Sequence, residues 1–227
     1  MAARAVFFDF GGTLVQAFRE AYPTYAAVLG AHGIEVSRER WGEVNHRVGD
    51  RLESLRYQLV RQTPSWGDRM DAETLRELGI PDPGGTLSTE LHDAFTAPES
   101  HRPYPESRGV IESLRRDGLS VHLVSNNVDW LLETVSRLDW TDLFDSVTFS
   151  QEAGAEKPDP RVFELALRRA GCEPLDGTYV GDTWEADYLG AKRTGLRAIW
   201  LNRDGVRPPE PCEMIRDLRE LPPLLNP

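Results

Sequence analysis

Cysteine is scarce in this chain of 227 residues, and long apolar runs are missing. The two cysteines, Cys172 and Cys212, form no CxxC pair and have no histidine cluster beside them, which argues against a disulfide framework and a zinc site. The apolar stretch near the N-terminus ends at Asp9, too early for a signal-peptide core or a membrane span. We therefore expect a cytoplasmic protein in a reducing compartment, with no membrane partner.

Basic charge is also in short supply. The formal net charge is -11 at pH 7 and the pI is about 5.0. Nucleic-acid binding requires clustered Lys and Arg that face the phosphates, so we expect no nucleic-acid partner. Lysine occurs only at positions 157 and 192, which makes any lysine-dependent chemistry easy to locate. A chain of this length can bury one core and a smaller appendage, as a monomer or a homodimer.

Short apolar runs alternate with helical patterns along most of the chain. The continuous run Ala5–Phe8 is bounded by a glycine-rich turn, which is typical of a strand buried on both faces of a parallel sheet. Further runs of this kind follow helical patterns at 120–124, 146–149, 178–180 and 197–201. This alternation predicts βαβ units and an α/β fold with a doubly wound parallel sheet.

One long segment interrupts the alternation. Between about residues 18 and 98, apolar residues recur at three- and four-residue spacings with no candidate strand, which predicts an all-helical insertion. We expect a helical cap domain at 18–98 and an α/β core domain at 1–17 and 99–227. The proline-rich tail from Val206 is expected to wrap the surface of the core.

Polar side chains stand at the ends of the predicted strands. Asp9 ends the first strand, Ser125 and Asn126 end the second, Lys157 follows the third and Asp182 ends the fourth. In an open α/β sheet, ligands bind beyond the carboxyl ends of the strands. A carboxylate there can attack phosphorus and form an aspartyl-phosphate, while Mg²⁺ offsets the repulsion between the two anions. A lysine and a hydroxyl would hold the phosphoryl oxygens.

Taken singly, each of these residues has a plainer interpretation. An aspartate after a strand is often only the cap of the next helix, and a serine there is often a turn residue. Independent caps would not fall on successive strand ends in this order, so the set as a whole favours a functional site.

Four motifs carry a resemblance to a known family. They are FFDFGGTL at 7–14, VHLVSNN at 121–127, EKPDPRVF at 156–163 and YVGDTWEADYLGAKRTG at 179–195. Together and in this order they resemble the haloacid dehalogenase-like (HAD) hydrolase superfamily, in the subgroup with a helical cap inserted after the first motif. The resemblance implies a HAD-like Rossmannoid core and a Mg²⁺-dependent phosphatase that acts on a small phosphorylated metabolite.

The resemblance also implies a role for each matching residue. Asp9 would be the nucleophile and would hold Mg²⁺ together with Asp182 and the backbone carbonyl of Gly11. Lys157 would hold the nucleophile and the phosphate together, and Asp187 would act from behind the metal ligands. Further contacts to the phosphate would come from Gly12, Thr13, Ser125 and Asn126.

Gly11 departs from the family pattern. Most phosphatases of this superfamily have an aspartate two residues after the nucleophile, where it serves as general acid and base. Loss of such a group costs roughly a hundredfold to ten-thousandfold in rate. Three interpretations follow: a phosphatase whose substrate or another residue supplies the proton, a dehalogenase or phosphonatase, or a catalytically impaired protein kept for binding or regulation.

The dehalogenase and phosphonatase interpretations are disfavoured by other residues. A phosphonatase of this superfamily uses a cap lysine, and no lysine precedes Lys157. A dehalogenase replaces the metal-binding pair that is present here as Gly181 and Asp182. Holding a cluster of like charges is costly without a metal, so we predict an active but weak phosphatase rather than a retired site.

Side chains of the predicted cap are further candidates. A proton donor could come from His32, His46 or Tyr57, and an anionic substrate could meet Arg47, Arg51 or Arg61. A lone histidine or arginine on a helix is more often a packed or solvated residue, so the sequence selects none of them.

Overall fold

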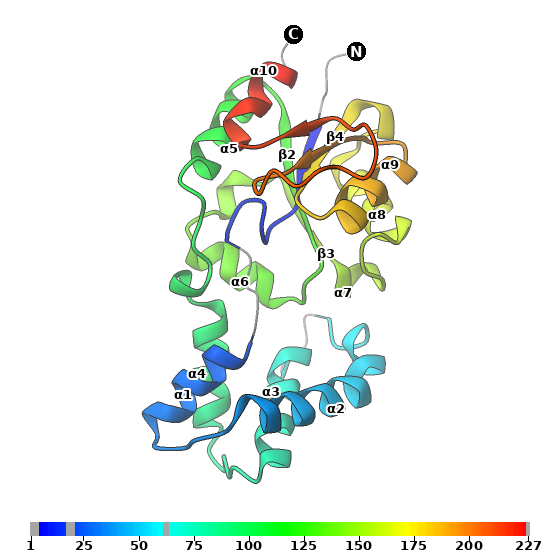
Figure 1. Cartoon of the computed structure of the whole chain (residues 1–227). Coiled ribbons are helices and arrows are strands. Elements are labelled where there is room, and N and C mark those ends of the chain that lie inside the picture. The colour runs from blue at the N-terminus through cyan, green and yellow to red at the C-terminus, as the bar shows by residue number, and fades with distance from the viewer. Residues whose placement is uncertain (1–4, 17–20, 61–63, 226–227) are drawn as a thin grey trace. The chain divides into compact units, whose positions relative to one another are not determined.

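The computed structural model describes residues 5–16, 21–60 and 64–225. By their internal packing these residues form two compact units. The first unit comprises Met1–Ala17, Arg102–Asn127 and Leu138–Pro227, and the second comprises Phe18–His101 and Val128–Arg137. Figure 1 draws the whole chain with its helices and strands labelled.

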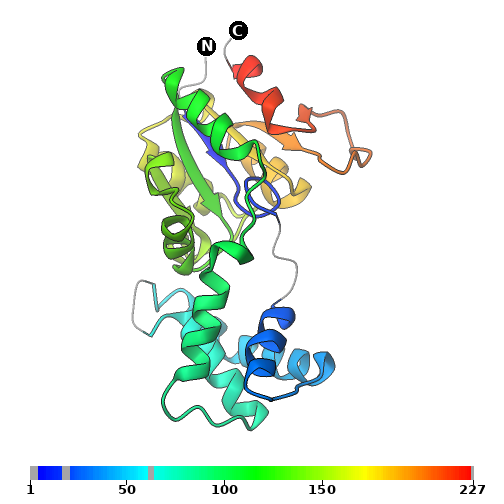
Figure 2. The same cartoon turned by 90° about the vertical axis from the view of Figure 1, so that its left-hand side faces the viewer.

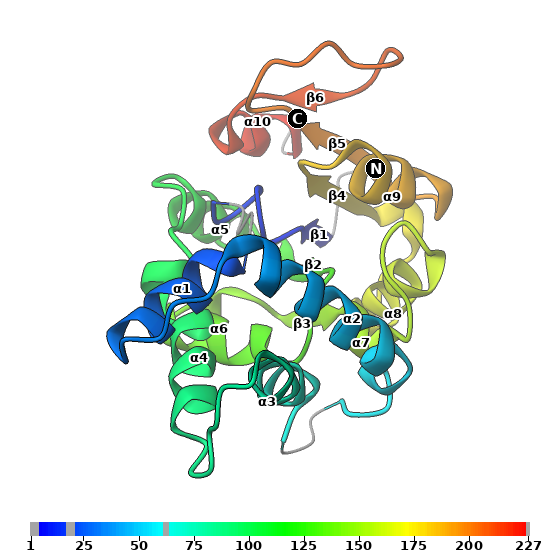
Figure 3. The ribbon, with the colours of Figure 1, turned by 60° about the horizontal axis from the view of Figure 1, so that its bottom comes forward.

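The first unit is built on a parallel sheet. The described strands are β1 (Ala5–Phe8), β2 (Ser120–Ser125), β3 (Ser146–Phe149), β4 (Gly177–Gly181), β5 (Arg197–Leu201) and β6 (Met214–Ile215). Their order across the sheet is β3-β2-β1-β4-β5-β6, and every neighbouring pair is parallel (Figure 3). β1 therefore lies between β2 and β4, which brings the carboxyl ends of these three strands together.

Helices cover both faces of this sheet. α5 (Ser107–Arg116) and α10 (Leu221–Leu225) lie on one face, and α8 (Pro160–Ala170) and α9 (Gly190–Arg193) lie on the other (Figures 2 and 3). β1 is fully buried because helices pack on both of its faces. The short helix α7 (Ser150–Ala153) directly follows β3, and a π-helical turn spans Trp184–Leu189. Single 3-10 turns lie at Pro98–Ser100, Thr141–Leu143, Pro174–Asp176 and Leu218–Glu220.

The predicted α/β fold is confirmed, with one addition at the C-terminal end. The sequence analysis expected the tail from Val206 to wrap the surface, but Met214 and Ile215 pair with β5 as the edge strand β6. A two-residue strand gives too short an alternation to be recognised among prolines. The chain then folds into α10, which packs against α5.

The elements of the second unit are all helices among its described residues. Its helices are α1 (Tyr22–Ala31), α2 (Arg38–Arg56), α3 (Trp66–Leu78), α4 (Thr86–Thr96) and α6 (Trp130–Arg137). One apolar cluster joins α1, α3 and α4 through Tyr25, Leu29, Leu75, Ile80, Leu87 and Leu91, and a second joins α2 and α3 through Val44, Val48, Leu52 and Met70. The three- and four-residue spacings seen in the sequence are the buried faces of these helices.

α6 groups with the helical unit although the sequence analysis counted residues 128–137 with the sheet. The indole Nε1 of Trp130 donates to Ser65 Oγ at 2.9 Å, and the Trp130 ring stacks on Phe95 with centroids 5.8 Å apart. Ion pairs at 2.7 Å from Glu133 to His92 and at 2.6 Å from Arg137 to Asp93 add to this packing. The expected boundary between residues 17 and 18 lies outside the described residues, and the role of the helical unit as a cap stays a prediction.

None of the described helices combines the length and the apolar character that crossing a membrane requires.

Candidate active site

The candidate residues of the first unit meet at the carboxyl ends of the strands. Asp9 directly follows β1, Ser125 is the last residue of β2 and Asp182 directly follows β4. Lys157 lies in the loop before α8, and its side chain is buried at the same edge. The parallel order β2-β1-β4 is what brings residues more than a hundred positions apart into contact.

Lys157 is the centre of the arrangement. Its Nζ lies 2.7 Å from Asp9 Oδ1, 2.6 Å from Asp187 Oδ1 and 2.9 Å from the hydroxyl of Tyr179. Burial alone would lower the pKa of Lys157, but the nearby carboxylates of Asp187 and Asp9 outweigh it and raise that pKa above its ordinary value. The lysine is therefore a fixed positive charge against the predicted nucleophile.

Asp187 faces Lys157 rather than solvent. Its Oδ1 accepts from Lys157 and, at 2.9 Å, from Tyr179, while its Oδ2 accepts from the backbone N–H of Thr183 at 2.9 Å. Both carboxylate oxygens are thus engaged by protein donors. This geometry agrees with a residue that orients Lys157 by direct contact.

Three carboxylates form an acidic cluster beside this lysine. Ligand oxygens of Asp9, Asp182 and Asp187 lie within 4.8 Å of one another. Burial, opposed by Lys157 and reinforced by the other two carboxylates, raises the pKa of Asp9 above its usual range. Burial followed by the charge of Asp187 likewise raises the pKa of Asp182. When all three carboxylates are ionised, the single ammonium of Lys157 neutralises only part of their charge, and the cluster stays negative.

The donor set fits a hard divalent cation. All the cluster's ligands are oxygens, which Mg²⁺ prefers, and a cation would relieve the repulsion between the buried carboxylates. Among the residues that the structure describes, Asp9 Oδ2 accepts no hydrogen bond. The hydroxyl of Thr13 donates to Asp182 Oδ1 at 3.3 Å, which orients the second carboxylate.

The three glycines of the site differ in whether the structure leaves space for a side chain. Gly12 has φ +86°, and a Cβ there would lie 2.3 Å from Asp182 Oδ2. A Cβ on Gly181 would lie 2.4 Å from the carboxyl carbon of Asp187. A Cβ on Gly11, by contrast, would meet no atom within 4 Å. Close approach of the carboxylates therefore requires glycine at Gly12 and Gly181, but the missing acid at Gly11 is not imposed by the fold.

Asn126 holds the loop that carries the lysine. Its Oδ1 accepts from the backbone N–H of Lys157 at 2.7 Å, and its Nδ2 donates to the carbonyl of Lys157 at 3.1 Å. Ser125 is buried beside it at the end of β2. The predicted phosphate contacts of Ser125 and Asn126 stay predictions, whereas the clamp on Lys157 is a contact that the sequence did not reveal.

Tyr179 is the residue that the sequence analysis missed. It belongs to β4, pairs with Phe7 in register and is 1% exposed, so it looks like any core residue of an apolar strand. Burial, followed by the charges of Asp187 and Asp9, raises its pKa well above the ordinary value of tyrosine. Its position three residues before Asp182 and its phenolic oxygen were the signals available in the sequence.

The candidate side chains of the helical unit already have partners there. Glu77 pairs with both Arg47 and Arg51, and Glu73 pairs with Arg51 at 2.9 Å. His32 pairs with Glu90 at 2.7 Å, and His46 lies 3.6 Å from Asp50. Tyr57 ends α2 beside Arg56, and Arg61 lies outside the described residues. No role in catalysis follows from these pairs.

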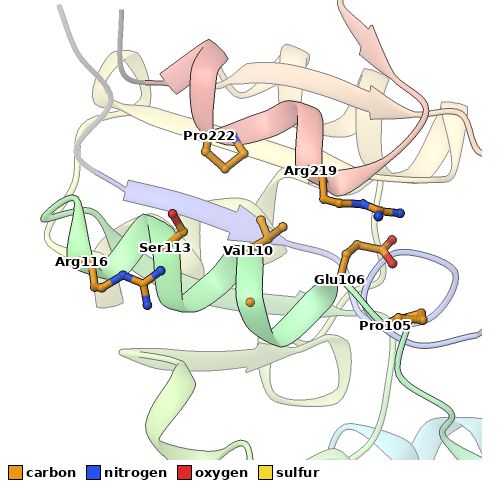
Figure 4. A pocket seen from close by; sticks show the side chains of 8 residues that line it. Pro105, Glu106, Val110, Ser113, Arg116, Arg219 and Pro222 are labelled. Atoms are coloured by element: carbon orange, nitrogen blue, oxygen red, sulfur yellow. The ribbon is translucent and has the colours of Figure 1, made fainter.

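A separate cavity of about 490 Å³ lies between α5 and the C-terminal segment. Figure 4 shows Arg219 and Pro222 of the C-terminal segment facing Val110 and Ser113 of α5. None of the predicted site residues lines it. It is linked to the site through Glu106, which pairs with Arg203 at 2.7 Å while Arg203 donates to the carbonyl of Thr13 at 2.9 Å.

Two phosphatases are similar to this chain in sequence. A phosphoserine phosphatase of Thermus thermophilus is 34% identical over 207 residues, which cover 89% of this chain and 76% of that protein. A glyceraldehyde 3-phosphate phosphatase of Methanothermobacter thermautotrophicus is 38% identical over 106 residues, covering 45% of this chain and 46% of that protein.

A solved structure is similar over nearly the full length. The 2-haloacid dehalogenase of Pseudomonas syringae pv. tomato DC3000 superposes with a TM-score of 0.79 and 26% sequence identity, covering 99% of this chain and 98% of that one. The family model described as haloacid dehalogenase-like hydrolase matches residues 3–195. With four motifs in order on one sheet edge, this chain belongs to the haloacid dehalogenase-like hydrolase family.

Proposed function

We propose that the protein is a Mg²⁺-dependent phosphatase that hydrolyses a small phosphorylated metabolite through an aspartyl-phosphate on Asp9. The observation that carries the proposal is the contact of Lys157 with both Asp9 and Asp187 beside Asp182. A nucleophile, a fixed cation and a set of oxygen ligands at one sheet edge are what phosphoryl transfer needs. The phosphatase names of two relatives support the same reaction class.

Mg²⁺ would be held by carboxylate oxygens of Asp9 and Asp182 and by the backbone carbonyl of Gly11. When bound, it would neutralise charge on the phosphoryl oxygens and so lower the repulsion against Asp9. Asp187 would not need to ligate the ion, because both of its oxygens accept protein hydrogen bonds.

The chain's own residues would divide the reaction into two displacements. The Asp9 carboxylate attacks phosphorus, and the bond from phosphorus to the leaving oxygen breaks. Lys157 neutralises the developing charge on the transferred group, as a preorganised cation does. Water then attacks the aspartyl-phosphate, loses a proton to solvent, and releases inorganic phosphate with Asp9 restored.

The leaving oxygen has no aspartate to protonate it, because Gly11 occupies that position. Substrates with an acidic leaving group need no general acid and should react fastest. Substrates with an alkoxide leaving group should lose roughly a hundredfold to ten-thousandfold against an enzyme that has the acid. This dependence on the leaving group is the signature of the proposed site.

The test is Mg²⁺-dependent phosphate release from an activated aryl phosphate and from phosphoserine and glyceraldehyde 3-phosphate, which the relatives' names suggest. Wild type should favour the aryl phosphate, and Asp9→Asn should be inactive. Gly11→Asp should accelerate the alkyl phosphates most, because it restores a carboxyl group at a position where a Cβ would meet no atom within 4 Å. A silent wild type beside an active Gly11→Asp would instead indicate a protein that binds without turnover.

Dehalogenation is the second candidate. It is favoured by the likeness to the 2-haloacid dehalogenase of Pseudomonas syringae and by the missing acid at Gly11. Halide release from 2-chloropropionate in the presence of a chelator measures it. Halide release by both wild type and Asp182→Asn would overturn the phosphatase proposal in favour of dehalogenation. Loss of phosphate release in Asp182→Asn would support the phosphatase proposal.

A further inference from the structure

The hydroxyl of Tyr179 lies among the charged groups of the active site while its ring belongs to the core. The ring meets Phe163 edge-on with centroids 5.2 Å apart, and the side chain packs in a cluster that includes Phe7 and Tyr188. A ring held on this many sides has few places to put its hydroxyl. The phenolic oxygen lies 2.9 Å from Lys157 Nζ and 2.9 Å from Asp187 Oδ1.

Counting hydrogens indicates what this hydroxyl does. The Lys157 ammonium has three hydrogens, and four oxygens surround it, the fourth being the carbonyl of Val124 at 3.2 Å. Asp9 and Asp187 take two hydrogens, so Tyr179 and the Val124 carbonyl compete for the third. The single hydrogen of Tyr179 is available to Asp187 Oδ1 or, at 3.3 Å, to the Val124 carbonyl.

Three acceptors besides Asp9 therefore hold the ammonium: Asp187, Tyr179 and the Val124 carbonyl. When a phosphoryl group is added to Asp9, the hydrogen that Lys157 donates to Asp9 must be donated to the phosphoryl oxygens instead. The other two hydrogens can still be donated, one to Asp187 and one to Tyr179 or the Val124 carbonyl. Without the phenolic oxygen, only Asp187 and a longer contact to the carbonyl would hold the ammonium in place.

We propose that Tyr179 is a positioning residue that holds the Lys157 ammonium against Asp9 during phosphoryl transfer. The role rests on the proposed function of the site. It adds to the roles inferred from the motifs, because it gives a core residue of β4 a share in the rate of the reaction through a lysine that it touches directly.

The kinetic test compares two tyrosines of the same core cluster. Tyr179→Phe removes only the phenolic oxygen, and Tyr188→Phe makes the same change at a residue that is also buried, with 5% exposure. In Mg²⁺-dependent hydrolysis of the aryl phosphate, Tyr179→Phe should lower kcat and kcat/KM together by about tenfold to a hundredfold. Tyr188→Phe should leave both at the wild-type value.

A second readout needs no turnover. Because Lys157 and Lys192 are the only lysines, isotope labelling of lysine gives one side-chain ammonium signal for each in an NMR spectrum. The buried Lys157 ammonium should exchange its hydrogens slowly in wild type and much faster in Tyr179→Phe. Lys192, whose side chain is 54% exposed, is the internal reference and should not change.

These measurements separate the possible failures. An active wild type with unchanged kcat in Tyr179→Phe would overturn the positioning role alone. A lowered kcat with an unchanged Lys157 signal would also overturn it, because the effect would then be general packing. Fast exchange of Lys157 in wild type would contradict the geometry itself. A wild type that hydrolyses no phosphate ester would overturn the proposed function, and with it the positioning role of Tyr179.

Discussion

Lys157 balances two carboxylates of the site with a single buried ammonium. Its side chain is 2% exposed, and it contacts Asp9 and Asp187 at 2.7 Å and 2.6 Å. Charges that are removed from water at this depth depend on one another, because neither can recover its hydration when its partner is lost. The lysine therefore contributes to the fold as well as to the proposed chemistry.

Replacing this lysine should destabilise the protein strongly. Lys157→Met leaves two buried carboxylates without their cation and should lower the free energy of unfolding by about 3 to 5 kcal/mol. Urea unfolding at neutral pH measures the change. Lys192→Met is the matched control, since its ammonium is exposed and meets only Glu210 at 3.3 Å among the described carboxylates. Equal stability of the two variants would contradict the assigned contacts.

Gly11 and Gly12 are adjacent in the sequence but differ in what they allow. Gly12 adopts a positive φ and faces the Asp182 carboxylate, whereas Gly11 has open space where a Cβ would be. Gly12→Ala should cost about 1 to 2 kcal/mol from the left-handed backbone alone, and the displaced Asp182 should bind Mg²⁺ more weakly. Gly11→Ala should keep both the stability and the Mg²⁺ affinity of the wild type.

Thermal unfolding and Mg²⁺ titration calorimetry on both alanine variants give the answer. Normal Mg²⁺ affinity in Gly12→Ala would show that Asp182 does not need its present position. Loss of Mg²⁺ affinity in Gly11→Ala would contradict the claim that a side chain at residue 11 leaves the site undisturbed.

The helical unit contains a buried acid between two of its helices. Asp71 of α3 accepts a hydrogen bond from the hydroxyl of Tyr25 of α1, and its Oδ2 has no hydrogen-bond partner among the described residues. Burial raises the pKa of Asp71 from 3.8 to about 7. The folded protein therefore keeps a proton that the unfolded chain has already lost between these two pH values.

The stability of this unit should fall as the pH rises. A folded pKa above the unfolded pKa means that the favourable contribution is complete below about pH 4 and is lost as the pH rises to about 7. Asp71→Asn cannot ionise, so its advantage over wild type should grow across this window by at most about 1.4 kcal/mol per pH unit. Urea unfolding at several pH values measures it, and a constant difference between the two proteins would contradict a buried, titrating Asp71.

The sequence identified the strand ends but not every contact between them. Asp9, Lys157 and Asp182 could be assigned to one sheet edge, because parallel strands that alternate with helices must bring their carboxyl ends together. Tyr179 could not be assigned, because a tyrosine in an apolar strand has the pattern of a core residue whichever way its hydroxyl points. The position of such a hydroxyl depends on packing from α8 and from β1, and β1 is distant in the sequence.

The helical segment was recognised from its period, whereas its full membership was not. Spacings of three and four predicted an all-helical segment at 18–98, but α6 joins its helices through contacts of Trp130, Glu133 and Arg137 with residues far away along the chain. An amphipathic helix shows that one face is buried and does not show against which unit. β6 was missed for a related reason, since two residues show no alternation.

The covalent intermediate on Asp9 can be observed by mass spectrometry of the intact protein. Wild type mixed with an aryl phosphate and Mg²⁺ and quenched in acid should gain the mass of one phosphoryl group, and fragmentation should locate it on Asp9. Asp9→Asn and a sample with chelator in place of Mg²⁺ should gain nothing. Mg²⁺-dependent phosphate release by wild type with no phosphorylated protein, or with the group on a residue other than Asp9, would contradict the mechanism proposed for this site.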